Sequence, residues 1–169
     1  GLNDRYVAYS SGFGHYGKNG HVISPYLGTN YNIGYLIIDR ELNINNIIID
    51  DCKDCDLCVR ACPTGAIKGD YTIEAQKCLS YVTQKKKLDD DEEILIKDCI
   101  YGCDICQKVC PHNHVLGDGL ESVFDGTKLL DLSNRLFKKE YGGYDFSWRG
   151  YGIIKRNVLL NFKNRKGDI

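Results

Sequence analysis

The sequence predicts an α+β protein built from three regions: residues 1–51, residues 52–114 and residues 115–169. Three observations support this division. The first region contains two short apolar runs of strand length. The second holds all nine cysteines, from Cys52 to Cys110. The third shows apolar residues at helical spacing, so we expect a small strand-containing part, a cysteine-rich module and a helical segment in that order.

The first region is rich in glycine and tyrosine. Residues Asp4–Ser11 have the pattern of a short helix, and four glycines between Gly12 and Gly20 then predict a loop that passes close to a ligand. The apolar runs Gly34–Asp39 and Asn46–Asp50 are the best candidates for strands.

Helices are expected in the remainder of the chain. The charged stretch Thr83–Lys97 is typical of an exposed helical insertion. Beyond the cysteines, apolar spacing predicts helices over Leu129–Tyr141 and Trp148–Phe162, separated by a Gly-Gly turn. The end of the chain is basic through Lys155, Arg156, Lys163, Arg165 and Lys166.

Composition limits the class of protein. A chain of 169 residues with 43% hydrophobic residues is large enough to fold around a core, and its net charge of −1 does not indicate an overall nucleic-acid or membrane surface. No apolar run is long enough to span a bilayer, and the N-terminus lacks the pattern of a signal peptide. We therefore expect a cytoplasmic protein without a membrane partner. Because methionine is absent, we also expect a piece of a longer protein.

The cysteine spacing carries the strongest chemical signal. The run Cys52–Pro63 places four cysteines at intervals of 2, 2 and 3 residues and ends in Cys-Pro. This is the bacterial ferredoxin pattern, in which three thiolates bind one 4Fe-4S cluster and the fourth binds a neighbouring cluster. The later run Cys103–Pro111 repeats the last three cysteines and the proline. Cys78 is the available substitute for the missing leading cysteine, so the module is predicted to be ferredoxin-like with two clusters.

The predicted ligands form two sets of four. The first cluster takes Cys52, Cys55, Cys58 and Cys110, and the second takes Cys62, Cys78, Cys103 and Cys106. Cys99 is left over and is expected to be a buried thiol packed as a small hydrophobic residue. Zinc bound by four thiolates is the chief alternative, but it explains neither the 2-2-3 spacing nor the two Cys-Pro ends.

When each cysteine run supplies one ligand to the cluster of the other run, the two clusters lie close together and form an electron path. Such a path is typical of an electron carrier or of an enzyme that passes electrons to its active site. About fifty residues precede Cys52 and nearly sixty follow Cys110, which is more than a simple two-cluster ferredoxin needs. The flanking residues therefore favour an enzyme.

Ordered motifs across nearly the whole chain resemble the epoxyqueuosine reductases, which are cobalamin-dependent iron-sulfur enzymes of queuosine biosynthesis in tRNA. The similarity begins with Leu2–Arg5 and the glycine loop Gly12–Asn19, and it continues through both cysteine runs. Its most specific parts are Cys78–Thr83, which reads Cys-x-Ser-Tyr-x-Thr, and Gly102–Asn113. Near the end, Arg156–Asn161 resembles the first helix of the helical-repeat tail that members use to bind tRNA.

The resemblance implies reductive removal of the epoxide oxygen from epoxyqueuosine in tRNA, with electrons passing through the clusters to cobalamin. Residues 1–51 then correspond to part of an α/β cobalamin-binding region. Asp4 is the candidate proton donor, with an N-cap or an ion pair to Arg5 as the alternative role. Gly14, Lys18 and Asn19 of the glycine loop are the candidate cobalamin contacts.

Further expectations concern partners and rival functions. The implied partners are tRNA and a reductant such as ferredoxin or flavodoxin, and the protein is expected to be a monomer. A cobalamin-dependent reductive dehalogenase shares the same cofactor plan, although the Ser80, Tyr81 and Gln107 signatures favour the tRNA enzyme. A ferredoxin-type electron carrier is the alternative from a different class.

Overall fold

The computed structural model describes residues 2–43, 52–97, 99–113 and 126–166. The chain forms two compact units, and each contains part of the cysteine module. The cluster unit consists of Gly1–Glu74 and Asp104–Gly119, and the helical unit consists of Ala75–Cys103 and Leu120–Ile169. These two units are defined by how compactly the chain packs. The boundaries predicted at residues 51 and 114 separate regions by their expected function, and they stay a prediction.

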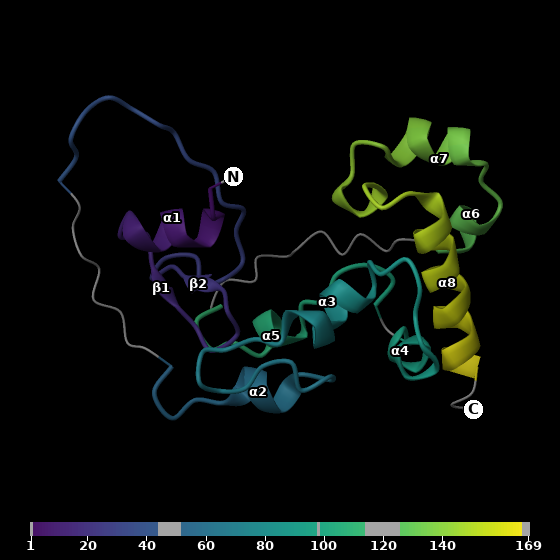
Figure 1. The fold of residues 1–169 in the computed structure, drawn as a ribbon, viewed down its shortest axis with the longest axis horizontal. Coiled ribbons are helices and arrows are strands. Elements are labelled where there is room, and N and C mark those ends of the chain that lie inside the picture. Colours follow the sequence, from purple (N-terminus) through teal and green to yellow (C-terminus); the bar gives the residue numbers. More distant parts are fainter. Residues whose placement is uncertain (1, 44–51, 98, 114–125, 167–169) are drawn as a thin grey trace. The chain divides into compact units, whose positions relative to one another are not determined.

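The cluster unit begins with helix α1 (Asp4–Ser10), as the sequence predicted. The helix starts where it does because the side chain of Asn3 accepts a hydrogen bond from the Tyr6 N–H group at the open end of the helix. After α1, strand β1 (His15–Tyr16) pairs antiparallel with strand β2 (Val22–Ile23), as Figure 1 shows. Both residues of β2 are buried, and β2 packs against α1.

Two short helices complete the described secondary structure of the cluster unit. Helix α2 (Leu57–Ala61) carries Cys58, and helix α5 (Ile105–Lys108) carries Cys106. They pack against each other although about fifty residues separate them in the sequence. This packing brings the two cysteine runs together.

The strand predicted at Gly34–Asp39 is wrong. This segment has no regular structure, and Leu36 and Ile37 are 91% and 85% exposed. Apolar residues form a strand only where the backbone finds a hydrogen-bonding partner, and this segment pairs with none of the described residues. The second predicted strand, Asn46–Asp50, lies outside the described residues.

The helical unit is organised around one long helix. Its described elements are η1 (Ala75–Lys77), α3 (Leu79–Val82), α4 (Asp90–Leu95), α6 (Thr127–Leu130), α7 (Asn134–Tyr141), η2 (Asp145–Ser147) and α8 (Tyr151–Lys166). Helices α4, α6 and α7 and the turn η2 all pack against α8, which is drawn in yellow in Figure 1.

Local signals explain where these helices begin and end. The expected helix over Leu129–Tyr141 is divided into α6 and α7, because Ser133 caps α7 by accepting a hydrogen bond from the Leu136 N–H group. Helix α8 begins at Tyr151 because Gly150 adopts a φ of +88°, which a helix does not allow. The expected insertion contains only the short helix α4, which starts with a capping box formed by Asp89 and Glu92.

Helix α8 carries much of the core of its unit. One buried group comprises Leu129, Phe137, Tyr151, Ile154 and Val158, and a second comprises Leu79, Val82, Ile96 and Leu160. Asn157 is fully buried, and its side-chain amide donates hydrogen bonds to the carbonyl oxygens of Thr83 and Ile100 at 2.6 and 2.8 Å. These bonds tie α8 to loops that run between the cysteines.

The predicted α+β class is confirmed at this level, since helices accompany one small antiparallel sheet. None of the helices described here combines the length and apolar character that crossing a membrane requires.

Candidate metal centre

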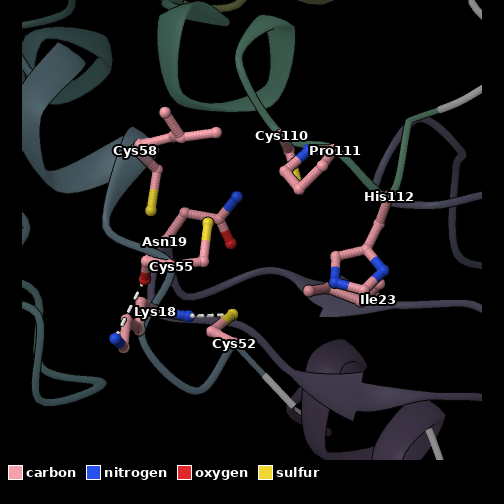
Figure 2. Close-up of a pocket in the computed structure, with 10 residues that line it drawn as sticks. Lys18, Asn19, Ile23, Cys52, Cys55, Cys58, Cys110, Pro111 and His112 are labelled. Carbon is pink, nitrogen blue, oxygen red and sulfur yellow. Dashed lines mark hydrogen bonds between the residues drawn. The ribbon is translucent and has the colours of Figure 1, made fainter. Parts of the chain in front are cut away.

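Four cysteines of the cluster unit line one hollow. Figure 2 shows Cys52, Cys55, Cys58 and Cys110 around it. Ile23, Leu57 and Pro111 add an apolar lining, and Lys18, Asn19 and His112 complete the wall. The structure therefore brings together the four residues that the sequence assigned to the first cluster, including Cys110 from the second run.

Three of these thiols come from one tight loop. The N–H group of Cys55 donates a 2.7 Å hydrogen bond to the carbonyl oxygen of Cys52, which closes the first turn. Lys53 lies inside that turn with a φ of +34°, a strained conformation for a residue other than glycine. Cys58 follows in the first turn of α2 and is buried. The spacing of two residues thus turns successive thiols toward the same side.

A side-chain clamp holds the segment that supplies Cys110. The oxygen of the Asn113 amide accepts a 2.6 Å hydrogen bond from the Thr29 N–H group, and its nitrogen donates to the carbonyl oxygen of Gln107 at 2.7 Å. Gly28 lies so close that a β-carbon there would overlap Asn113. Asn113 therefore fixes the end of the second cysteine run against the loop after β2.

The thiols of the hollow influence one another electrostatically. Burial raises the pKa of Cys58, and the charges of Cys52, Cys110 and Cys55 raise it further. Burial also raises the pKa of Cys110, with Cys52 and Cys55 contributing in the same direction and a backbone hydrogen bond from His112 opposing it. Gathered thiolates of this kind repel each other, so a positively charged centre among them is favoured.

The donor set fits an iron-sulfur cluster. Within the described part of the chain, no three Cys, His, Asp or Glu side chains converge as ligands of a single metal ion do. The four thiols instead surround a hollow. A 4Fe-4S cluster takes one thiolate at each iron, so its ligands are spread around it and need not meet at one point.

Lys18 supports the loop that carries Cys52 and Cys55, two of the predicted cluster ligands. Its N–H group donates to the sulfur of Cys52 at 3.5 Å, and its ammonium donates to the carbonyl oxygen of Cys55 at 2.9 Å (Figure 2). The ammonium also donates to the carbonyl oxygen of Lys53 at 2.6 Å. The ammonium thus braces the strained turn at Lys53. The predicted cobalamin contact of Lys18 stays a prediction.

The other two glycine-loop candidates also have structural roles. A β-carbon at Gly14 would overlap the carbonyl oxygen of Ile23, so the absence of a side chain lets the loop approach β2. Asn19 is buried, lines the thiol hollow and accepts a hydrogen bond from the His21 N–H group at 3.1 Å. Their cobalamin contacts likewise stay predictions.

Asp4 is the first residue of α1 and is exposed. The N-cap is Asn3, so the capping alternative for Asp4 is wrong. The guanidinium of Arg5 donates to the carbonyl oxygen of Gly20 at 2.8 Å. The catalytic role of Asp4 stays a prediction.

The second predicted ligand set is distributed over both units. Cys62 and Cys106 belong to the cluster unit, and Cys78 and Cys103 belong to the helical unit. Burial raises the pKa of Cys62, but hydrogen bonds from the Thr64 side chain and from the backbone of residues 64, 66 and 67 outweigh it, so the net shift is downward. Stabilised thiolate character is what a metal ligand needs. That these four cysteines share a cluster stays a prediction of the sequence.

Cys99 is partly exposed and packs against the buried group of Leu79, Val82, Ile96 and Leu160. It therefore has the apolar packing that the sequence led us to expect, with less burial.

Sequence reasoning missed two contributors. The clamp of Asn113 and the bracing of the loop by Lys18 both depend on contacts across more than thirty residues. The only signal in the sequence was their place in the motifs: Lys18 follows Gly17, and Asn113 lies two residues after the last Cys-Pro.

Comparison with known proteins agrees with this geometry. The model of the 4Fe-4S double cluster binding domain matches residues 51–113. Epoxyqueuosine reductases of Staphylococcus aureus and Lactococcus garvieae are 37% and 39% identical over 94% and 96% of this chain, which covers 44% and 49% of those proteins. The chain thus spans about half the length of the curated relatives it matches.

Solved structures give the same result. The epoxyqueuosine reductase of Streptococcus thermophilus superposes with a TM-score of 0.89 at 38% identity, over 97% of this chain and 46% of that one. An epoxyqueuosine reductase crystallised with an epoxyqueuosine-modified tRNA-Tyr stem loop superposes with a TM-score of 0.78 at 32% identity, over 98% of this chain and 47% of that one. The epoxyqueuosine reductase of Bacillus subtilis superposes with a TM-score of 0.81 at 35% identity, over 98% of this chain and 47% of that one. In that structure the catalytic loop, which contains an aspartate, is swung out of the active site.

The cysteine hollow and the matching domain define an iron-sulfur protein of the two-cluster 4Fe-4S type. Over nearly its whole length, the chain is then similar in sequence and in fold to about half of an epoxyqueuosine reductase.

Proposed function

We propose that the protein containing this chain reduces epoxyqueuosine to queuosine in tRNA, and that this chain relays the electrons through two 4Fe-4S clusters. The observation that carries the proposal is the hollow lined by four thiols, in a chain that matches the reductases over more than nine-tenths of its length. Removing the epoxide oxygen as water consumes two electrons and two protons, so the protein must supply both.

The electron path uses the two predicted ligand sets. Cys52, Cys55, Cys58 and Cys110 hold the first cluster, which their common hollow supports. Cys62, Cys78, Cys103 and Cys106 hold the second, as the ferredoxin spacing indicates. A small reductant such as ferredoxin or flavodoxin delivers the electrons.

Cobalamin is part of the proposal through the family relationship. When bound, cobalamin supplies a cobalt centre that accepts electrons and acts on the epoxide. We infer the cobalamin contacts of Gly14, Lys18 and Asn19 from the family relationship alone. The Lys18 ammonium also donates to the cysteine loop and the Asn19 side chain accepts within the glycine loop, so both side chains are proposed to shape the cluster site as well.

Asp4 is the proposed proton donor. A carboxyl group can protonate the leaving epoxide oxygen, and Asp4 is exposed at the start of α1 in the same unit as the thiol hollow. The related Bacillus subtilis enzyme has a catalytic loop that contains an aspartate and is swung out of the active site in its structure, which supports an aspartate in this role.

The proposed substrate is tRNA, and the protein is proposed to act as a cytoplasmic monomer. A related reductase binds a modified tRNA stem loop, and the helical unit ends in a basic stretch that suits a polyanion.

The experiment that tests the function is anaerobic incubation of the gene product with cobalamin, a low-potential reductant and tRNA that contains epoxyqueuosine. We expect queuosine in the digested tRNA. Retention of both clusters without cobalamin binding or turnover would identify an electron carrier. Cobalamin binding with reduction of organohalides alone would identify a dehalogenase.

Asp4→Asn separates the proton donor from the cofactors. We expect turnover to fall about a hundred- to ten-thousandfold, because general acid catalysis contributes that much. The iron content and bound cobalamin should not change. Normal turnover by this variant would exclude Asp4 as the donor.

A further inference from the structure

An open hollow in the helical unit has no role in the electron path. It has a volume of about 580 Å³ and lies between the end of α7 and the start of α8. That volume falls within the range of about 300–1,000 Å³ that small-molecule sites occupy. Its described lining consists of Asn134, Phe137, Lys138, Gly142, Ser147, Trp148, Gly150 and Tyr151.

The floor of the hollow is aromatic and rigid. Phe137 and Tyr151 are buried, with ring centroids 5.1 Å apart. The hydroxyl of Tyr151 shares its single proton between the carbonyl oxygens of Leu129 and Leu130, at 2.5 and 3.1 Å. The floor therefore belongs to the core and keeps its shape without a ligand.

Trp148 forms a wall and is 61% exposed. Its indole N–H group donates a 2.9 Å hydrogen bond to the side-chain oxygen of Gln84, whose nitrogen donates to the carbonyl oxygen of Ser80. These bonds hold the ring in one orientation. An exposed aromatic ring that is already held in place loses little conformational entropy when a planar group stacks on it.

Positive charge surrounds this aromatic surface. The guanidinium carbon of Arg149 lies 4.0 Å from the centroid of the Trp148 ring, and Lys138 lines the hollow. Between Gly126 and Lys166 the sequence contains ten Lys and Arg residues against three Asp and Glu residues, in a chain whose net charge is −1. The hollow therefore lies in the part of the chain best suited to a polyanion.

We propose that this hollow binds an unstacked base of a single-stranded RNA loop, with the base on Trp148 and the adjoining phosphates near Lys138 and Arg149. An aromatic platform beside cations is how proteins bind bases outside a duplex. Arg149 stacks on the Trp148 ring but does not line the hollow. The part of the ring that faces the hollow is therefore not covered by the guanidinium. The inference rests on the proposed tRNA substrate and names the surface that receives its loop.

The sequence provides a direct reporter, because Trp148 is the only tryptophan. The 169-residue chain, with its clusters assembled anaerobically, is titrated with an unmodified RNA stem loop, and tryptophan fluorescence is followed. We expect saturable quenching, because stacking changes the environment of the indole. A blunt RNA duplex of the same stem should quench far less.

Affinity of the variants is measured separately by filter binding. Trp148→Ala should weaken binding of the stem loop about 5- to 150-fold, whereas Trp148→Phe, which keeps a ring, should lose much less. Tyr26→Ala is the matched control, because Tyr26 is 82% exposed and lies in the cluster unit. It should bind as the unaltered chain does.

Three results would overturn the inference: unchanged fluorescence while the stem loop is bound, equal quenching by the duplex, or no binding of RNA to this chain. The reductase proposal is decided independently by formation of queuosine. Turnover without quenching would leave the function intact and remove only the stacking site.

Discussion

The ammonium of Lys18 donates a 2.9 Å hydrogen bond to the carbonyl oxygen of Cys55. This bond places a positive charge on the loop that carries three of the predicted ligands of the first cluster. Reduction adds negative charge to a cluster, so a nearby cation stabilises the reduced form and raises the reduction potential.

Lys18→Met should therefore lower the potential of the first cluster. The expected shift is about 40 mV, which corresponds to roughly 1 kcal/mol for one electron at an intermediate effective dielectric. The backbone N–H group that faces the Cys52 sulfur remains in the variant, so the shift isolates the charge. Potentiometric titration followed by electron paramagnetic resonance measures it.

Lys139→Met provides the control for Lys18, because it removes the same charge from an exposed position on α7 in the other unit. Iron analysis should show that both variants keep their clusters. Equal potentials in the two variants would mean that Lys18 only braces the loop.

Asn113→Ala should make the first cluster more labile. The change removes the hydrogen-bonding partners of the Thr29 N–H group and the Gln107 carbonyl group, and each unsatisfied group costs about 1–3 kcal/mol when buried. We expect iron to be lost to a chelator roughly tenfold faster under anaerobic conditions. Asn30→Ala, at an exposed position on the same loop, is the control and should lose iron at the original rate.

The ligand assignment is tested by two serine substitutions. The unaltered chain should contain about eight iron and eight sulfide per molecule, as two clusters require. Cys78→Ser should reduce both to about four, because an alcohol is a poor substitute for a thiolate. Cys99→Ser should keep both values, since Cys99 packs against apolar side chains. If Cys78→Ser kept both clusters and Cys99→Ser lost one, Cys99 would be the cluster ligand and Cys78 the packed thiol.

The basic residues of α8 should divide into two groups. Arg156 donates hydrogen bonds to the carbonyl oxygens of Lys85 and Lys86 at 2.8 and 3.1 Å, so it is used inside the helical unit. The side chains of Lys163 and Arg165 are exposed, and the Lys163 ammonium forms a 4.0 Å ion pair with the Glu93 carboxylate that water can reach. We expect Lys163→Gln with Arg165→Gln to flatten the salt dependence of RNA binding by about 1–2 in the log-log slope.

Arg156→Gln serves as the comparison within the same helix. It should lower the thermal unfolding temperature and keep the salt slope of the unaltered chain. A flattened slope with unchanged stability would mean that Arg156 contacts phosphate instead of the backbone of its own unit.

The sequence alone predicted most of the chemistry. Three thiols at intervals of two and two residues in one loop are close in space in any compact arrangement, so the sequence alone predicted that Cys52, Cys55 and Cys58 share one site, and the structure places all three around one hollow. The helix at Asp4 was equally predictable, because its N-cap and its length depend on neighbours in the sequence. Local geometry determined these features.

The tertiary structure decided what depends on distant partners. The sequence gives no sign that the Lys18 ammonium donates hydrogen bonds to carbonyl groups more than thirty residues away, and only the structure shows this contact. Composition suggested a strand at Gly34–Asp39, but the segment finds no partner within the described residues and stays irregular. Position in a basic helix shows only a positive charge at Arg156, whereas the structure shows that its guanidinium donates to backbone oxygens of another loop. A hydrogen bond needs both of its partners, and the sequence shows only one of them until the chain has folded.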